Sequence, residues 1–132
     1  MSFMLWTIVT SVAILFFVLM YQGGLVPRYQ SLKWGLGPRD EPKEKSAIQG
    51  RATRTVQNHM EGMLMYIPLA FIAHNLGLSG HLIIWGGWLY VIGRIGFVFC
   101  YLGGVYALRS AFWGVGLLGT LLVFAKIMMA GL

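Results

Sequence analysis

Long apolar stretches alternate with short stretches that hold glycine, proline and charge. Each apolar stretch reaches the roughly 20 residues that a membrane-spanning helix needs. The pattern therefore predicts an all-α membrane protein that forms a single domain over residues 1–132, a bundle of four transmembrane helices. The expected helices are Phe3 to Tyr21, Ser46 to about Leu76, His81 to about Val105, and Ser110 to Leu132.

The signals at the ends of these stretches set the expected connections. Gly23, Gly24 and Pro27 are expected to stop the first helix, because glycine and proline both disfavour a helix interior. The charged stretch that follows, residues 28–49, is predicted to be an exposed loop. Ser46 is a suitable N-cap for the second helix, and Pro68 is expected to kink that helix.

Composition agrees with a membrane location. Of the 132 residues, 58% are hydrophobic and 11% are charged, whereas soluble chains carry about 25% charge. The single cysteine, Cys100, excludes an internal disulfide and a zinc-cluster spacing, and we interpret it as a packing thiol. No metal site is expected.

The distribution of positive charge predicts the orientation. Most of the ten Lys and Arg residues lie in the first connection or the adjacent helix start, Arg109 lies in the expected third connection, and the second connection has none. The positive-inside rule then places the first and third connections in the cytoplasm and both termini on the opposite side. Charge beside membrane spans is explained by topology and anionic headgroups, so nucleic acid is not an expected partner.

Polar side chains share one face at the start of the second helix. At about 100° per residue, Arg51, Arg54, Asn58 and Glu61 fall within an arc of about 80°. A solvated helix start usually scatters its charges around the axis. This concentration favours a site that holds a polar ligand.

Glu61 and Arg94 are expected to lie at the same depth in the membrane. Counted from the uncharged connection between their helices, both lie about 21 to 23 Å along the helical rise. An unpaired charge at that depth costs several kcal/mol, so we expect an ion pair between them. The pair is either a structural link between two helices or part of a ligand site.

Further side chains extend the polar face toward the cytoplasmic surface. Arg94, Phe97 and Tyr101 share one face of the third helix, and Arg109 follows the end of that helix. The excess of arginine over acid predicts an anionic occupant, and the guanidinium fork suits carboxylates. The alternative is that these arginines only anchor the protein to headgroups, which explains Arg51 but not the placement of Asn58 and Tyr101.

The spacing resembles a known family. Arg51-x-x-Arg54-x-x-x-Asn58-x-x-Glu61, the pair Gly93-Arg94, and the segments 101–103 and 108–110 are similar to the membrane-associated proteins in eicosanoid and glutathione metabolism (MAPEG), in particular to microsomal glutathione transferases. The resemblance covers nearly the whole chain. It implies a four-helix protomer, a homotrimer, and glutathione bound between neighbouring subunits.

The resemblance also implies roles for individual residues. The carboxylates and the amino group of glutathione would be held by Arg51, Arg54, Asn58 and Glu61, with Arg94 and Tyr101 from the facing helix. Arg109 matches the arginine that stabilises the thiolate, and Ser110 matches the serine beside it. Arg28 is the candidate for a basic residue contributed by the adjacent subunit.

The implied function is glutathione-dependent transfer to a lipophilic electrophile that partitions from the membrane lipid, either as detoxifying conjugation or as peroxide reduction. Phe97 stands where eicosanoid synthases of the family carry a polar His or Tyr, which argues against eicosanoid-specific chemistry. A non-catalytic lipid-binding or scaffold protein of the same fold is the alternative. A small multidrug transporter fits less well, because the first span has no ionisable residue.

Overall fold

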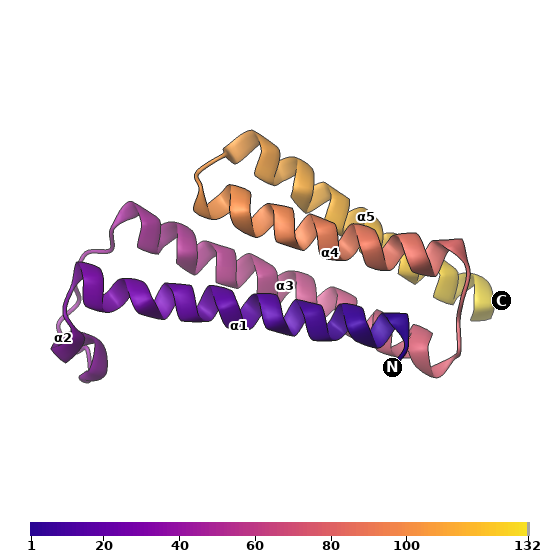
Figure 1. Cartoon of the computed structure of the whole chain (residues 1–132), viewed down its shortest axis with the longest axis horizontal. Helices are drawn as coiled ribbons and strands as arrows, with labels where there is room; N and C mark the ends of the chain where they lie inside the picture. The colour runs from indigo at the N-terminus through magenta and orange to yellow at the C-terminus, as the bar shows by residue number, and fades with distance from the viewer. Residues whose placement is uncertain (132) are drawn as a thin grey trace.

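The computed structural model describes residues 1–131 and is entirely helical over its regular elements (Figure 1). Four helices are long and one is short. In chain order they are α1 (Phe3–Tyr29), α2 (Leu32–Leu36), α3 (Ala47–Asn75), α4 (His81–Leu102) and α5 (Tyr106–Gly131).

The four long helices are arranged as two hairpin-like pairs. Helix α1 packs on α3, α4 packs most extensively on α5, and α3 contacts all three of the others. Both termini and the α3–α4 connection lie at one end of the bundle, while α2 and the α4–α5 connection lie at the other end (Figure 1). The first and third connections therefore share an end of the bundle, as their predicted placement on one side of the membrane requires.

Three helices, α1, α4 and α5, are long and apolar enough to cross a membrane within the described part of the chain. Helix α3 has 29 residues, about 44 Å at the helical rise, but its first half carries the polar face. The membrane character of the chain is thus supported, and a fourth span formed by α3 remains a prediction.

The predicted end of the first helix was wrong. Helix α1 continues through Gly23, Gly24 and Pro27 to Tyr29. A proline in a helix disturbs the carbonyl four residues earlier, which here belongs to the flexible Gly23. The proline is also exposed, so water or headgroups can satisfy the freed carbonyl. As a result Arg28 belongs to the last turn of α1 and not to a loop.

The predicted start of the second long helix is confirmed. Ser46 is the N-cap of α3, and its hydroxyl accepts the backbone N–H of Gln49, while the Gln49 side chain accepts the N–H of Ser46. This reciprocal pair satisfies two of the free N–H groups of the first turn. The cap fixes where the polar face of α3 begins.

Small residues let α4 and α5 approach closely. A Cβ at Gly93 would overlap the backbone of Gly116, and a Cβ at Gly119 would overlap the backbone of Tyr90. Such contacts are typical of helix pairs in membranes, where backbone proximity replaces the hydrophobic driving force.

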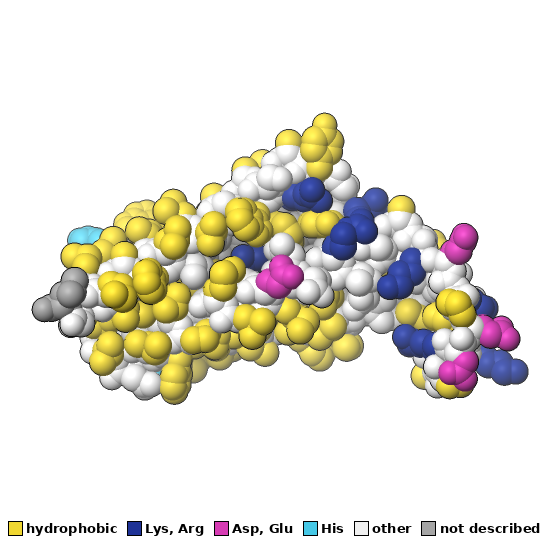
Figure 2. Space-filling model, turned by 180° about the vertical axis from the view of Figure 1, so that it is seen from behind, with side chains coloured by type: hydrophobic (Ala, Val, Ile, Leu, Met, Phe, Trp, Pro, Cys, Tyr) yellow, Lys and Arg dark blue, Asp and Glu magenta, His cyan; other side chains and the backbone are white. Residues whose placement is uncertain are grey.

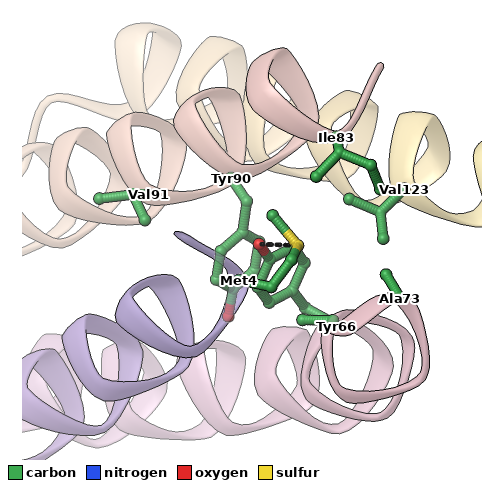
Figure 3. Packing of buried hydrophobic residues seen from close by; sticks show 8 residues of the cluster. Met4, Tyr66, Ala73, Ile83, Tyr90, Val91 and Val123 are labelled. Atoms are coloured by element: carbon green, nitrogen blue, oxygen red, sulfur yellow. Dashed lines mark hydrogen bonds between the residues drawn. The ribbon is translucent and has the colours of Figure 1, made fainter. Parts of the chain in front are cut away.

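The buried core of the bundle mixes apolar and hydroxyl side chains (Figure 3). The rings of Tyr66 and Tyr90 stack with centroids 3.5 Å apart. Their hydroxyls hydrogen-bond Thr7 at 2.7 Å and Ser11 at 2.8 Å, respectively. Each buried hydroxyl is therefore satisfied, and the two tyrosines link α1 to α3 and α4.

The orientation can be tested by labelling single cysteines. In a Cys100→Ala background, Lys43→Cys is expected to react with an impermeant maleimide only from the cytoplasmic side, and Ser79→Cys only from the opposite side. The physical reason is the concentration of Lys and Arg at the α2 end of the bundle. Labelling with the two sides exchanged would show that the orientation is inverted.

Candidate functional site

The C-terminal end of α4 turns sharply into α5. The N–H of Val105 donates to the carbonyl of Cys100 at 2.8 Å, and the N–H of Gly104 donates to the backbone carbonyl of Tyr101 at 3.2 Å. Gly104 has a φ of 78°, a left-handed conformation that favours glycine. This paired hydrogen-bond pattern is a Schellman motif, and it brings the first turns of α5 back beside Tyr101.

The fourth helix was predicted to start at Ser110, but α5 begins at Tyr106. Arg109 therefore lies in the first turns of a helix and not in a connection. Three residues suffice for the reversal, because the glycine at position 104 adopts the conformation that other residues avoid.

Tyr101 lies between two guanidinium groups. Arg54 Nε, from α3, donates to the Tyr101 hydroxyl at 3.0 Å. Arg109 Cζ, from α5, lies 4.5 Å from the centroid of the same ring, which is the geometry of a cation–π contact. One aromatic side chain thus holds an arginine at its edge and another over its face.

Arg51 is held at the end of α4. Its Nε donates to the carbonyl of Leu102 at 3.2 Å. Carbonyls in the last turn of a helix lack partners within the helix and carry partial negative charge, so a cation is favourable there. This bond fixes the start of α3 against the end of α4.

A pocket of about 550 Å³ lies between the start of α3 and the α4–α5 turn. Its cationic side chains are Lys45, Arg51, Arg54 and Arg109, and its lining includes no acidic residue. In Figure 2 the Lys and Arg side chains gather mostly toward the end of the molecule that carries α2, while hydrophobic side chains cover the other half. The pocket therefore offers an anionic ligand several charges that no acid in its lining neutralises.

The predicted site divides into two groups. Arg51, Arg54, Tyr101 and Arg109 line the pocket together, as the sequence indicated. The remaining polar members of the predicted helix-two and helix-three faces do not line it, and they lie further along the helices from the α2 end. This deeper group, counted along the helix axes, is Asn58, Glu61 and Arg94.

The expected ion pair between Glu61 and Arg94 is not present among the described residues. Arg94 Nη1 instead donates to the Asn58 side-chain oxygen at 3.1 Å and to the Asn58 carbonyl at 3.4 Å. Glu61 is exposed and accepts a hydrogen bond from Gln57 at 3.1 Å. Equal depth did place the two residues level, but it did not fix the direction in which Glu61 points.

The angular positions on α3 explain this difference. Asn58 and Gly62 are one turn apart and share a face, and that face meets Arg94. Glu61 points roughly 60 to 100° away from it at 100° per residue. The Glu61 carboxylate therefore remains available on the outer surface of the single chain.

Arg94 occupies a space made by glycine. The residue is 2% exposed, and a Cβ at Gly62 would overlap its guanidinium. Gly116 lies on the α5 side, where an added Cβ would come within 3.4 Å of Arg94 Nε. That Nε is buried and makes no hydrogen bond among the described residues. The absence of a side chain at Gly62 is what accommodates the buried arginine, whereas a Cβ at Gly116 would make an ordinary contact with it.

Gly62→Ala is accordingly expected to destabilise the protein. The added methyl must displace the Arg94 guanidinium from its buried position, and overpacking of this kind costs about 1 to 3 kcal/mol. Thermal unfolding in detergent measures the effect. Gly114→Ala is the matched control, because a Cβ there meets nothing within 4 Å. Equal midpoints for the two variants would contradict this description of the Arg94 environment.

The last two predicted residues do not line the pocket within one chain. Ser110 is exposed, and its hydroxyl donates to the Tyr106 carbonyl at 3.2 Å in the first turn of α5. Arg28 is exposed near the end of α1, with its guanidinium 5.9 Å from the ring of Tyr29. A contribution from Arg28 to a neighbouring subunit remains a prediction.

Sequence reasoning missed Lys45 and Tyr106 as pocket residues. Both line the pocket. Lys45 immediately precedes the N-cap of α3, and Tyr106 is the first residue of α5. The position of Lys45 next to a recognisable N-cap was a usable signal. Tyr106 could not be placed, because the expected start of the last helix was four residues too late.

A family model, and not an individual relative, places the chain in a family. A comparison with individual curated proteins returns no significant match. The model of the MAPEG family matches residues 1–129, which is nearly the full length of the 132 residues. Together with the four long helices and the arginine-lined pocket at one end of the bundle, this match shows that the chain belongs to the MAPEG family.

Proposed function

We propose that the protein binds glutathione in the pocket at the α2 end of the bundle and activates its thiol for attack on a lipophilic electrophile. The observation that carries the proposal is the Arg54–Tyr101–Arg109 arrangement, in which one tyrosine holds two guanidiniums beside the same pocket. The MAPEG family includes glutathione-dependent enzymes, and the proposal assigns that chemistry to this member.

The donor set suits glutathione. The tripeptide carries two carboxylates and one ammonium group, so its net charge is negative. Arg51 and Arg54 each retain terminal N–H groups beyond the Nε bond that fixes them. Guanidiniums bind carboxylates in a bidentate manner, and they would hold the two ends of the peptide.

The deeper polar group would complete the site in an assembled protein. Glu61 is exposed in the single chain and has no cationic partner among the described residues, so it suits the ammonium group of the ligand. Arg94 positions Asn58 through its hydrogen bond, and Asn58 is partly exposed beside Glu61. Arg28 and Ser110 would join the site in the homotrimer that the resemblance implies.

Arg109 is assigned the chemical role. Its guanidinium lies over the Tyr101 ring at the pocket wall, where it would stabilise the negative charge of a thiolate. A free thiol with a pKa of about 8.5 is about 3% ionised at pH 7, and a decrease of two units makes it about three-quarters ionised. That decrease corresponds to about 2.7 kcal/mol, which one nearby arginine in a poorly solvated site can supply.

The electrophile would arrive from the lipid. The outer surfaces of α1, α4 and α5 expose large apolar side chains, and these helices have the length and composition of membrane spans. A lipophilic molecule therefore already concentrates next to the bundle. The reaction class is conjugation or peroxide reduction with glutathione as the nucleophile.

Arg54→Ala tests the binding part of the proposal. Loss of one charge-assisted hydrogen-bonding partner is expected to raise the KM for glutathione about tenfold, equivalent to about 1.4 kcal/mol, with a smaller change in kcat. The assay is conjugation of a generic aromatic electrophile by the purified protein in nanodiscs. Lys33→Gln is the control, because it removes one positive charge at the same end of the bundle from a residue that lies outside the pocket.

The same assay separates an enzyme from a scaffold. Glutathione-dependent turnover supports the proposal, whereas binding of lipophilic molecules without thiol-dependent turnover supports the non-catalytic alternative. An Arg54→Ala protein with an unchanged KM would contradict the assignment of the pocket.

A further inference from the structure

A second pocket lies on another side of α3. It has a volume of about 250 Å³ and is formed by the last turns of α1, the start of α3, and the segment that contains α2. Gln49 and Thr53 of α3 line it, whereas Gly50 and Arg54 line the candidate glutathione pocket. Because neighbouring positions on a helix point about 100° apart, these are two separate faces of α3. Only Lys45 borders both pockets.

The outer end of this second pocket is cationic. Arg39, Lys43 and Lys45 line it, and its lining includes no acidic side chain. Lys43 Nζ and Arg39 Cζ lie 6.0 Å and 5.4 Å, respectively, from the Trp34 ring. The segment is therefore folded so that two cations lie around one aromatic side chain at the pocket mouth.

Hydrogen bonds hold that segment in place. Trp34 Nε1 donates to the Glu41 carbonyl at 2.8 Å, and Arg39 Nη2 donates to the Gly35 carbonyl at 2.7 Å. Arg39 is the one non-glycine residue with positive φ in residues 1–131. The cations at the pocket mouth thus belong to a structured turn and not to a free tail.

The side chains that line the middle of the pocket, from the end of α1 and the start of α3, are polar but uncharged. The side chains of Gln30 and Gln49 donate to each other at 2.9 Å and 2.6 Å, and Gln22 donates to Thr53 at 3.1 Å. These amides already satisfy one another. A negatively charged ligand would therefore be held by the cations at the mouth.

The inner end of the pocket is apolar and open. Leu19, Gly23 and Val26 line it from one face of α1. A Cβ at Gly23 would meet nothing within 4 Å, so packing within the chain does not require glycine there. Glycine in a helix interior is destabilising relative to alanine. Its presence leaves this face of α1 without a side chain between Leu19 and Val26, and an extended apolar chain can lie along this apolar strip.

We propose that this second pocket binds an anionic membrane lipid, with the headgroup phosphate at Arg39 and Lys43 and an acyl chain along α1 at Gly23. The pocket joins a cationic mouth to the apolar strip of Leu19, Gly23 and Val26 on a helix with the character of a membrane span. A lipid with an anionic headgroup has both parts in the same order, whereas a free phosphate has only the first. Anionic lipids are attracted to basic segments beside membrane spans, and here the attraction has a shaped site.

Native mass spectrometry of the detergent-purified protein tests the proposal. Dioleoyl phosphatidylglycerol is expected to bind at least fivefold more tightly than dioleoyl phosphatidylcholine. Lys43→Gln is expected to reduce phosphatidylglycerol binding at least threefold. Lys33→Gln removes the same charge from the same segment but lies outside the pocket, so it should leave binding nearly unchanged.

The apolar strip on α1 has its own test. Gly23→Leu fills the open space and is expected to weaken phosphatidylglycerol binding at least threefold. Gly114→Leu adds the same side chain at another open position and is the matched control. Glycerol 3-phosphate, the headgroup fragment alone, is expected to bind at least tenfold more weakly than the intact lipid.

Several results would overturn the proposal. Equal binding of the two lipids would exclude headgroup recognition, and equal losses for Lys43→Gln and Lys33→Gln would show that only diffuse charge matters. Binding of glycerol 3-phosphate as tight as that of the lipid would make this a free-phosphate site. The KM for glutathione in Lys43→Gln should stay at the parental value, because the two pockets lie on separate faces of α3.

Discussion

Replacing Arg109 with alanine is expected to return bound glutathione from mostly thiolate to mostly thiol at neutral pH. The guanidinium lies at the pocket wall over the Tyr101 ring, and its removal takes away the cation that favours the ionised form. A rise of the thiol pKa from about 6.5 to about 8.5 lowers the thiolate fraction at pH 7 from about three-quarters to about 3%, roughly 25-fold. The conjugation rate falls less steeply, because a more basic thiolate is a better nucleophile.

The direction of the pH dependence follows from that shift. The lowered pKa matters between about pH 6 and 8, where only the parent holds a thiolate, and the difference disappears above about pH 9, where both thiols ionise. Ultraviolet absorbance of the thiolate, titrated from pH 5 to 10 in both proteins, measures the shift. Identical titration curves would move the thiolate partner to Tyr101 or Ser110, whose hydroxyls can donate to sulfur.

Gly93→Leu is expected to cause the largest loss of stability. Helix α4 lies directly against α5 at this point, because even a Cβ at Gly93 would overlap the backbone of Gly116. A backbone cannot swing aside as a side chain can, so the two helices must separate. The expected cost is about 3 kcal/mol or more, at the upper end of overpacking effects.

Thermal unfolding in detergent measures this loss, and Gly114→Leu is the control. Gly114 lies on the same helix as Gly116, but a Cβ there meets nothing within 4 Å. Its replacement should therefore change the midpoint little. A Gly93→Leu protein as stable as the Gly114→Leu protein would contradict the close packing of α4 on α5.

Local signals explain which parts of the fold could be predicted. The start of α3 was predictable because Ser46 and Gln49 form a capping box within four residues. The end of α1 was not, because glycine and proline usually break helices, whereas this long apolar helix tolerates them at exposed positions. The start of α5 depended on the turn at Gly104, where a left-handed glycine and two local hydrogen bonds end α4 and let α5 begin at Tyr106.

The candidate site was predictable for the residues that the spacing along each helix places near the α2 end of the bundle. Arg51 and Arg54 meet Tyr101 and Arg109 at one pocket, as the charge pattern and the family resemblance implied. The pairing of Arg94 with Glu61 was wrong, because depth along an axis does not determine rotation about it. Gly62 leaves the space in which the arginine fits, and a glycine next to a buried cation has no signature in a single sequence.

Two of the candidate site residues face outward in the single chain. Glu61 and Arg28 are both exposed in the single chain, and their proposed roles need surfaces that a neighbouring subunit would supply. The homotrimer remains a proposal that rests on the family.

Equilibrium binding of glutathione to the detergent-purified protein, measured by isothermal titration calorimetry, tests the central claim most directly. The four cationic side chains around the pocket predict saturable binding at millimolar concentration or tighter, weakened about tenfold by Arg54→Ala and unaffected by Lys33→Gln. Absence of binding at millimolar glutathione, or equal binding by the parent and Arg54→Ala, would contradict the claim that this pocket is a glutathione site.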